Sequence, residues 1–369
     1  MTRLGLGRRP SGRPARPAVI VCRWDLDKTY LRSDFDSLRQ LVRTAFERAE
    51  DKVDVPGVAE LIKALKDAGE RQGQPVQVFF VSASPPQIGK AIRDKLALDG
   101  IPYDGIVFKN QLRHLRPGKL HNLREHVGFK LAELLRGRLA APLESHELLF
   151  GDDWESDSLI YSLYADVLAG RLTPAELEPV LRRIRVDPAV IRSILALAAR
   201  AAGRDVVERI FINLERRTPP ATFRLFGPRL VPVFNYFQAA AVLAADGHLD
   251  AADVLRVGRA LAERAGSSPR QLANSLDDLV RRTHLTPGRA AILVGRLRAA
   301  GLLPPAEPGR VGWRQALGAL GRLGRARRRV VAPPPAPRAG GPLDYHAILD
   351  RQRPVPRPRT VPPAVTEVP

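Results

Sequence analysis

The chain has 369 residues, of which 44% are hydrophobic and 27% charged, and its formal net charge at pH 7 is +20. This length exceeds one ordinary hydrophobic core and predicts two folded units with tails. No apolar run approaches the roughly 20 residues of a membrane-spanning helix, which argues against a transmembrane protein. The single cysteine excludes an internal disulfide and a thiolate metal cluster. We therefore expect a cytoplasmic protein.

The positive charge is concentrated at the two ends of the sequence. Five arginines and no acidic residue lie in the first 20 positions, and twelve arginines against three acidic residues lie from Arg310 onward. Fourteen of the 33 prolines lie at or after Pro304. We expect residues 1–16 to be a disordered basic arm and residues 304–369 a disordered Pro/Arg-rich tail. Such segments either attract polyanions, namely nucleic acid, anionic lipid headgroups or acidic proteins, or are plain solvated tails.

Residues 17–170 alternate between short apolar runs and amphipathic stretches. The expected strands are residues 18–22, 76–81, 106–108 and 147–150, and the expected helices include residues 58–65, 88–98 and 130–139. Strands that alternate with helices indicate βαβ units. This region is therefore predicted to be an α/β domain with a parallel sheet covered by helices on both faces.

The strand signals fade between residues 171 and 303, where we expect an all-α helical domain. Thr173, Asp187 and Ser268 each precede a proline in the manner of a helix N-cap. One helical face is predicted to hold Val206, Val207, Ile210, Phe211 and Leu214. The aromatic and proline-rich segment from Phe223 to Phe237 is expected to pack between helices rather than to form a strand.

Two carboxylates follow the first expected strand, in the sequence Asp25-Leu26-Asp27-Lys28-Thr29. In a parallel sheet, ligands bind beyond the carboxyl ends of the strands. Two carboxylates two residues apart suit a divided role, in which one attacks the substrate and the other donates and then removes a proton.

The next expected strand ends at Ser82, directly before Ala83. The Ser82 hydroxyl and the amides that follow it are suited to hold phosphoryl oxygens near a helix N-terminus, and the alternative is a plain polar strand end. Lys130 is expected to open an amphipathic helix. Taken singly, a lysine at such a place is usually a solvated surface residue.

Four acidic residues follow the last expected strand within six positions, in Gly151-Asp152-Asp153-Trp154-Glu155-Ser156-Asp157. Their mutual repulsion is costly unless a cation offsets it. Helix capping accounts for one or two of these residues but not for all. Because carboxylates are hard oxygen ligands and no cysteine or histidine cluster accompanies them, the cation they indicate is magnesium rather than zinc.

In this order the motifs resemble the four-motif signature of the haloacid-dehalogenase superfamily, over about residues 18–165. The residues within these motifs are also similar to those of the catalytic domain of the actin-patch-associated phosphatidate phosphatases. That closer resemblance depends on residues 79–85, 100–102, Lys130 with its leucine-rich helix, and 151–161. The chain departs from the pattern in the extra Asp153 and in the Arg/His-rich stretch from Asn110 to Val127.

The resemblance implies a haloacid-dehalogenase-like Rossmannoid sheet and a stepwise phosphatase mechanism. Asp25 is expected to attack phosphorus and form an aspartyl-phosphate. Asp27 is expected to protonate the leaving oxygen and then to activate water.

The resemblance also implies the ligands of the metal and of the phosphoryl group. Magnesium is expected on the Asp25 side chain, the Asp27 carbonyl and Asp152, with Asp153 or Asp157 in support. The phosphoryl oxygens are expected to be bound by Thr29, Ser82, Ala83 and Lys130.

Three functions remain open for this sequence. Phosphatidate or another phospholipid is the leading substrate class, because the short spacing between the first two motifs leaves no room for a large lid domain, and basic tails favour an anionic membrane surface. A nucleic-acid or nucleotide phosphatase would use the same catalytic residues. A non-catalytic interaction protein on the same fold is the third alternative.

Overall fold

Six strands form one sheet at the centre of the computed structural model, which describes residues 19–26, 29–30, 55–82, 86–109, 119–154, 156–305 and 341–352. The strand order is β3-β2-β1-β4-β5-β6, and each neighbouring pair is parallel. The strands are β1 (Val19–Asp25), β2 (Val76–Ser82), β3 (Gly105–Phe108), β4 (Ser145–Asp152), β5 (Val207–Asn213) and β6 (Leu230–Val233). The predicted parallel sheet is confirmed.

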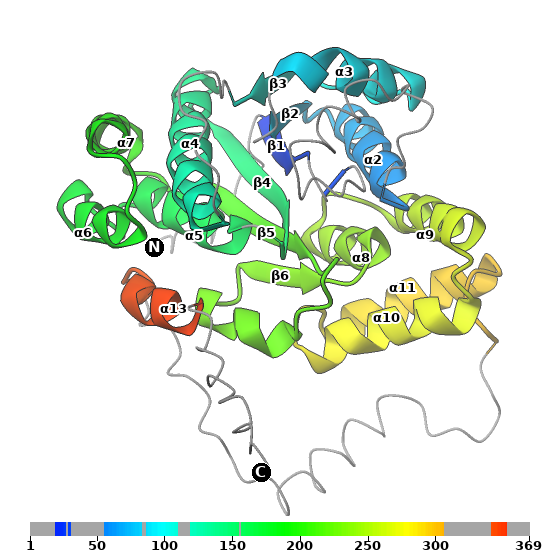
Figure 1. Ribbon diagram of the computed structural model, residues 1–369. Helices are drawn as coiled ribbons and strands as arrows, with labels where there is room; N and C mark the ends of the chain where they lie inside the picture. The colour runs from blue at the N-terminus through cyan, green and yellow to red at the C-terminus, as the bar shows by residue number, and fades with distance from the viewer. Residues whose placement is uncertain are drawn as a thin grey trace, which may run out of the picture.

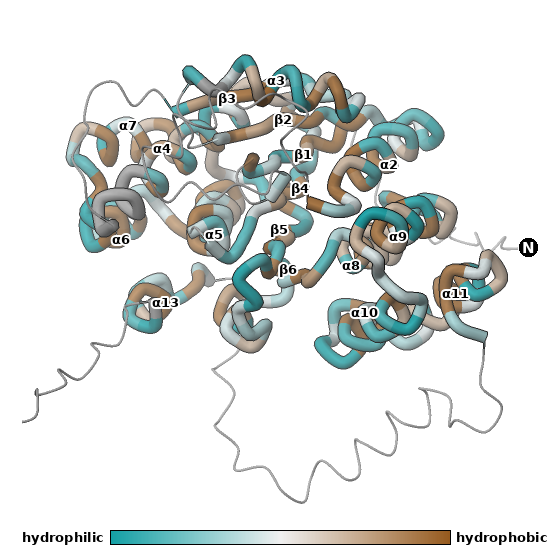
Figure 2. Tube along the Cα trace, turned by 45° about the vertical axis from the view of Figure 1, so that its right-hand side comes forward, coloured by the Kyte–Doolittle hydropathy of each residue, from teal (hydrophilic) through white to brown (hydrophobic). Residues whose placement is uncertain are grey.

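Helices cover both faces of this sheet (Figure 1). One face is covered by α2 (Val58–Arg71), α3 (Gly89–Leu98), α8 (Tyr236–Asp246), α9 (Ala251–Ala265), α10 (Pro269–Arg281) and α11 (Pro287–Ala299). The other face is covered by α4 (Lys119–Ala140), α5 (Asp157–Leu168), α6 (Pro174–Ile184), α7 (Pro188–Ala201) and α13 (Tyr345–Gln352). Two short 3₁₀ helices, η2 (Pro86–Ile88) and η3 (Pro220–Phe226), complete the described elements. The outer helices alternate between hydrophilic and hydrophobic residues along each turn (Figure 2), as expected of helices packed on one side only.

Aromatic side chains on three adjacent strands stack across one face of the sheet. The ring of Trp24 on β1 lies parallel to that of Phe150 on β4, with centroids 3.7 Å apart. Phe150 in turn stacks on Phe211 of β5 at 5.1 Å. All three side chains are buried, and stacked aromatic pairs add to the free energy gained by removing their apolar area from water. This stack fixes the positions of the strand ends that follow it.

The predicted helix starts at Thr173, Asp187 and Ser268 are confirmed. Thr173 and Ser268 each form a reciprocal capping box, and the Asp187 carboxylate accepts from the amides of Ala189 and Val190. The prediction that Lys130 opens a helix is wrong, because α4 already begins at Lys119. Lys130 therefore lies in the interior of a long helix.

The expectation of an all-α region between residues 171 and 303 is wrong. Strands β5 and β6 lie inside it and pair with the sheet that β1 to β4 form. The segment from Phe223 to Phe237 likewise contains β6 rather than only a connection between helices. A parallel strand buried on both faces reads as a nearly continuous apolar run, so its spacing also fits a helical face.

The end of the chain carries one element that the sequence analysis did not predict. Residues 341–352 include α13, whose Tyr345 is buried and donates from its hydroxyl to Oδ2 of Asp166 at 2.6 Å. For these residues the prediction of a disordered tail is wrong, while residues 1–16, 306–340 and 353–369 lie outside the described residues. No helix in the described part of the chain is long and apolar enough to cross a bilayer.

Candidate active site

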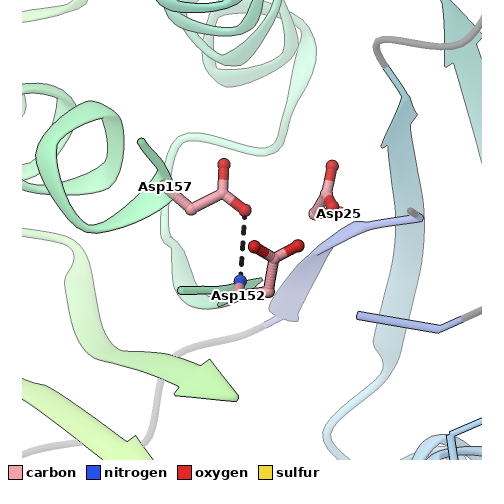
Figure 3. A group of neighbouring side chains, drawn as sticks. All are labelled: Asp25, Asp152 and Asp157. Carbon is pink, nitrogen blue, oxygen red and sulfur yellow. Dashed lines mark hydrogen bonds between the residues drawn. The ribbon is translucent and has the colours of Figure 1, made fainter. Parts of the chain in front are cut away.

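Three carboxylates meet at the carboxyl edge of the sheet (Figure 3). Asp25 is the last residue of β1, Asp152 is the last residue of the adjacent strand β4, and Asp157 is the first residue of α5. Each offers an oxygen that lies within 4.8 Å of the others, and all three residues are buried. The parallel topology thus brings together acidic residues that lie far apart in the sequence.

Lys130 reaches this group from the interior of α4. Its Nζ lies 2.7 Å from Oδ1 of Asp25 and 2.7 Å from Oδ1 of Asp157. The Lys130 side chain is 1% exposed, so water screens these interactions little. The structure thus places Lys130 beside the predicted nucleophile rather than on the surface.

Thr29 connects the carboxylates of β1 and β4. Its hydroxyl lies 3.4 Å from Oδ2 of Asp25 and 3.5 Å from Oδ2 of Asp152. The Thr29 carbonyl accepts a hydrogen bond of 2.7 Å from the hydroxyl of Tyr236, the first residue of α8. Burial, together with the charges of Asp152 and Asp25, raises the pKa of Tyr236 well above its ordinary value. Tyr236 therefore stays protonated and holds Thr29 in place.

Gly151 makes room for the Asp157 carboxylate. Oδ2 of Asp157 accepts from the backbone amide of Asp152 at 3.3 Å. A Cβ atom at position 151 would lie closer than 3.0 Å to that same oxygen and to two further atoms of the Asp157 side chain. A glycine is required before Asp152 because of this close approach.

Asp153 has a different role from the one predicted. Its carboxylate accepts from the backbone amides of Arg216 at 2.8 Å and Thr218 at 3.0 Å, in the loop after β5. Its own amide donates to the carbonyl of Asn213 at 3.1 Å. The structure does not bring Asp153 into the carboxylate group, so its predicted part in metal binding is not supported.

Ser82 lies at the end of β2, the strand that flanks β1 on the side away from β4. It is fully buried, and its carbonyl accepts from the amide of Lys109. Its position at the carboxyl edge agrees with the predicted one. Asp27 and Ala83, predicted as proton donor and phosphate ligand, lie outside the described residues.

The charges of this site fit a divalent cation. Among the described residues, three buried carboxylates lie with the ammonium group of Lys130, and together these four groups carry net negative charge at a place where water screens little. Carboxylate oxygens are the ligands that magnesium prefers. One oxygen of Asp152 also accepts from the amide of Trp154 at 2.6 Å, which holds that carboxylate in place.

Asn213 is a residue of this edge that the sequence analysis missed. It ends β5, pairs in register with Asp152, and is 3% exposed. Because register partners on parallel strands direct their side chains to the same face of a sheet, its side chain shares a face with that of Asp152. Its Nδ2 has no hydrogen-bond partner among the described residues. Asn213 is a polar residue at the end of an apolar run, which is typical of a site residue at a strand end. The spacing of that run also fits a helical face, and this hid the strand.

Comparison with protein families tests the resemblance that the sequence indicates. Residues 20–173 match the family described as phosphatidate phosphatase APP1, catalytic domain. The resemblance stated from the sequence is thereby confirmed, and the match supports a phosphatase. Comparison with curated proteins and with solved structures finds no match.

The phosphatidate phosphatase APP1 catalytic-domain match covers Asp25, Lys130, Asp152 and Asp157. It ends before β5, β6 and α8 begin. Tyr236, which supports Thr29, thus comes from a part of the chain that the family match does not include.

Proposed function

We propose that this protein is a magnesium-dependent phosphomonoester hydrolase of the haloacid-dehalogenase type, acting through an aspartyl-phosphate on phosphatidate or another phospholipid. The observation that supports this most is the contact of Lys130 with Asp25 inside the three-carboxylate group, at the sheet edge that the family match covers. A buried carboxylate beside a lysine and a cation site suits nucleophilic attack on phosphorus.

In the first step Asp25 attacks the phosphorus of the phosphomonoester in line with the leaving oxygen. A bond forms between a carboxylate oxygen and phosphorus, and the bond from phosphorus to the leaving oxygen breaks. The leaving oxygen takes a proton from Asp27, and the product alcohol departs. Lys130 and Ser82 hold oxygens of the phosphoryl group, where negative charge gathers in the transition state.

In the second step Asp27 takes a proton from water, whose oxygen attacks the phosphorus of the aspartyl-phosphate. The bond between Asp25 and phosphorus breaks, so that phosphate is released and both carboxyl groups return to their starting states. A magnesium ion held by Asp25, the Asp27 carbonyl and Asp152 would neutralise charge on the phosphoryl group during both steps.

The proposal is tested by measuring phosphate release with magnesium and with a chelator. The substrates are an aryl phosphate, phosphatidate vesicles and an oligonucleotide with a terminal phosphate. We expect magnesium-dependent release that prefers phosphatidate and that Asp25→Asn lowers by several orders of magnitude, because the covalent route is lost. Asp94→Asn is the control, since the interaction that Asp94 makes among the described residues is an exposed pair with Lys90.

The outcomes of this assay separate the alternatives. Preference for the oligonucleotide would move the assignment to a nucleic-acid phosphatase. Full activity of Asp25→Asn would rule out the mechanism. No release from any of the three substrates would favour an interaction protein on this fold.

A further inference from the structure

Two aromatic side chains lie exposed at the same edge of the sheet as the carboxylate group. Among the large apolar side chains of the described residues, six are exposed, and only Trp154 and Phe234 of these are aromatic, with exposed fractions of 38% and 45%. Single exposed apolar residues are common on protein surfaces. Here, however, both exposed aromatic rings occur beside the candidate active site.

The register of the strands shows how near to the site they lie. Trp154 follows the last residue of β4, Asp152, by two positions, and Phe234 directly follows the last residue of β6. Asp152 pairs in register with Asn213 of β5, which pairs with Val233. Since neighbouring strands are about 4.8 Å apart, the chain at these two strand ends is separated by about 10 Å.

Each of the two rings is paired with an arginine. Cζ of Arg216 lies 4.7 Å from the centroid of Trp154, and Cζ of Arg282 lies 5.8 Å from that of Phe234. We call Trp154, Arg216, Phe234 and Arg282 the aromatic rim. A guanidinium over an aromatic ring forms a cation–π pair that places positive charge beside an apolar surface.

Backbone contacts anchor both arginines to the sheet edge. The amide of Arg216 donates to Oδ1 of Asp153, which follows β4. Nη1 of Arg282 donates to the carbonyl of Pro232 in β6 at 2.6 Å, and its Nε donates to Asp278 at 2.7 Å. The two rings of the aromatic rim therefore follow strand ends, and its two arginines are held to that edge from the loop after β5 and from the end of α10.

We propose that the aromatic rim docks on the surface of an anionic phospholipid bilayer and brings the carboxylate group to the headgroups. Tryptophan and arginine are suited to the membrane interface, because each joins an apolar body to a polar or charged tip. In the segment 215–217, exposed Arg216 and Arg217 outnumber the one exposed acidic residue, Glu215, whereas the charge of Arg282 is offset by its ion pair with Asp278. The Trp154 side of the rim therefore complements anionic headgroups. This inference rests on the proposed function, whose substrate it places in a bilayer.

The same side chains suit nucleic acid less well. Proteins that bind single strands present open aromatic faces on which bases stack. Here an arginine already lies over one face of each ring, so at most one face of each ring is available for a base. Insertion of ring edges between lipid headgroups needs no open face.

The first test measures binding without turnover. The full chain is mixed with phosphatidate-containing vesicles in chelator, at about 0.3 M salt so that the basic tails contribute little. We expect the double variant Trp154→Ala/Phe234→Ala to bind about tenfold more weakly, because both apolar anchors are lost. The matched control is Leu98→Ala/Leu143→Ala, which removes two exposed apolar side chains elsewhere on the surface and is expected to bind like the wild type.

A second readout follows Trp154 itself. The difference in emission between wild type and Trp154→Phe is expected to shift to the blue when vesicles are added and to be quenched by brominated lipid. Unchanged binding of the rim variant, or a Trp154 signal that ignores vesicles, would overturn the docking surface. A Trp154 response to single-stranded DNA but not to vesicles would overturn the lipid assignment.

Activity measurements keep the two proposals apart. The rim variant is expected to lose about tenfold more in kcat/KM on vesicles than on a water-soluble aryl phosphate, because a change at the Asp152 carboxylate would affect both substrates alike. If no substrate is hydrolysed but vesicle binding depends on the rim, the proposed function fails and the docking surface stands. If vesicles are hydrolysed equally by the rim variant and the wild type, the docking surface fails and the proposed function stands.

Discussion

Lys130 and Asp25 form an ion pair in which Nζ lies 2.7 Å from Oδ1, with each side chain only 1% exposed. Oδ1 of Asp157 lies at the same distance from the ammonium on another side. Removing two charges from water is costly, and the pair is stable only because each charge has partners within hydrogen-bond distance. The lysine thus both orients the proposed nucleophile and offsets part of the negative charge around it.

Lys130→Met should lower activity by at least about 100-fold, because the proposed ligand of the phosphoryl oxygens is lost. In chelator it should also lower the free energy of unfolding by about 3–5 kcal/mol, since buried carboxylates lose their partner. Magnesium should raise the Tm of this variant more than that of the wild type. Thermal unfolding with magnesium and with chelator measures both effects.

The control for this variant is Lys90→Met, because Lys90 pairs with Asp94 on an exposed helix surface. Such pairs contribute little, so its Tm and activity should stay near those of the wild type. A Lys130→Met protein with the same magnesium response as the wild type would contradict the prediction that Lys130 and the ion offset the same carboxylate charge.

Gly151→Ala should reduce both stability and activity. The added methyl group would collide with the Asp157 carboxylate, which must then move away from Lys130 and from the Asp152 amide. Gly295→Ala is a matched change with the opposite expectation, since nothing lies within 4 Å of its added methyl group in α11. That control should be more stable than the wild type by about 0.5–1 kcal/mol. Chemical denaturation of both variants measures the contrast, and equal stability of the two would contradict the prediction.

Tyr236→Phe should affect the site through the Thr29 carbonyl. The lost hydrogen bond should cost about 1 kcal/mol of stability, and kcat should fall because Thr29 contacts both Asp25 and Asp152. Tyr345→Phe removes a comparable buried bond to Asp166, away from the carboxylate group. That control should lose stability but keep kcat. Equal kcat in Tyr236→Phe and Tyr345→Phe would mean that α8 does not support the site.

His284 should make the protein less stable in mild acid. Burial, with the nearby charges of Arg282 and Arg209, lowers its pKa from 6.5 to about 4. Between these values the unfolded chain binds a proton that the folded chain does not, so the free energy of unfolding falls as pH falls from 6.5 toward 4. The difference in stability between pH 7 and pH 4.5 should be smaller in His284→Gln. If His284→Gln loses as much stability between pH 7 and pH 4.5 as the wild type does, His284 does not titrate in this way.

Strands β1 to β4 could be predicted because each is followed by turn-forming or charged residues that mark its end. Strand β5 also ends in a polar residue, Asn213, with charged residues after it. It was nevertheless missed because its buried residues occur on both faces of the sheet and their spacing fits a helix equally well. The helix α13 was missed because its Tyr345 and Ile348 are few apolar residues among many prolines and arginines. Their burial against the helices of one face depends on tertiary contacts that composition does not reveal.

The site was predictable to the extent that residue type determines it. Asp25, Asp152 and Lys130 meet because the strand ends and α4 place them at one edge. Sequence could not distinguish Asp153 from Asp152, because both are aspartates. Only the loop after β5 determines which backbone amides donate to the Asp153 carboxylate. Tyr236 contacts the site through the backbone carbonyl of Thr29, and a contact with a backbone atom leaves no sequence motif.

The sheet has a consequence for how this catalytic unit can be moved between proteins. β4, which carries Asp152, pairs with β5, and β5 lies beyond the end of the family match at residue 173. A fragment cut there would expose the unpaired backbone of β4 along an apolar edge, which is prone to aggregate. A transplant or fusion that keeps the active site must therefore carry β5 and β6 with it, so the smallest portable unit is longer than its recognisable signature.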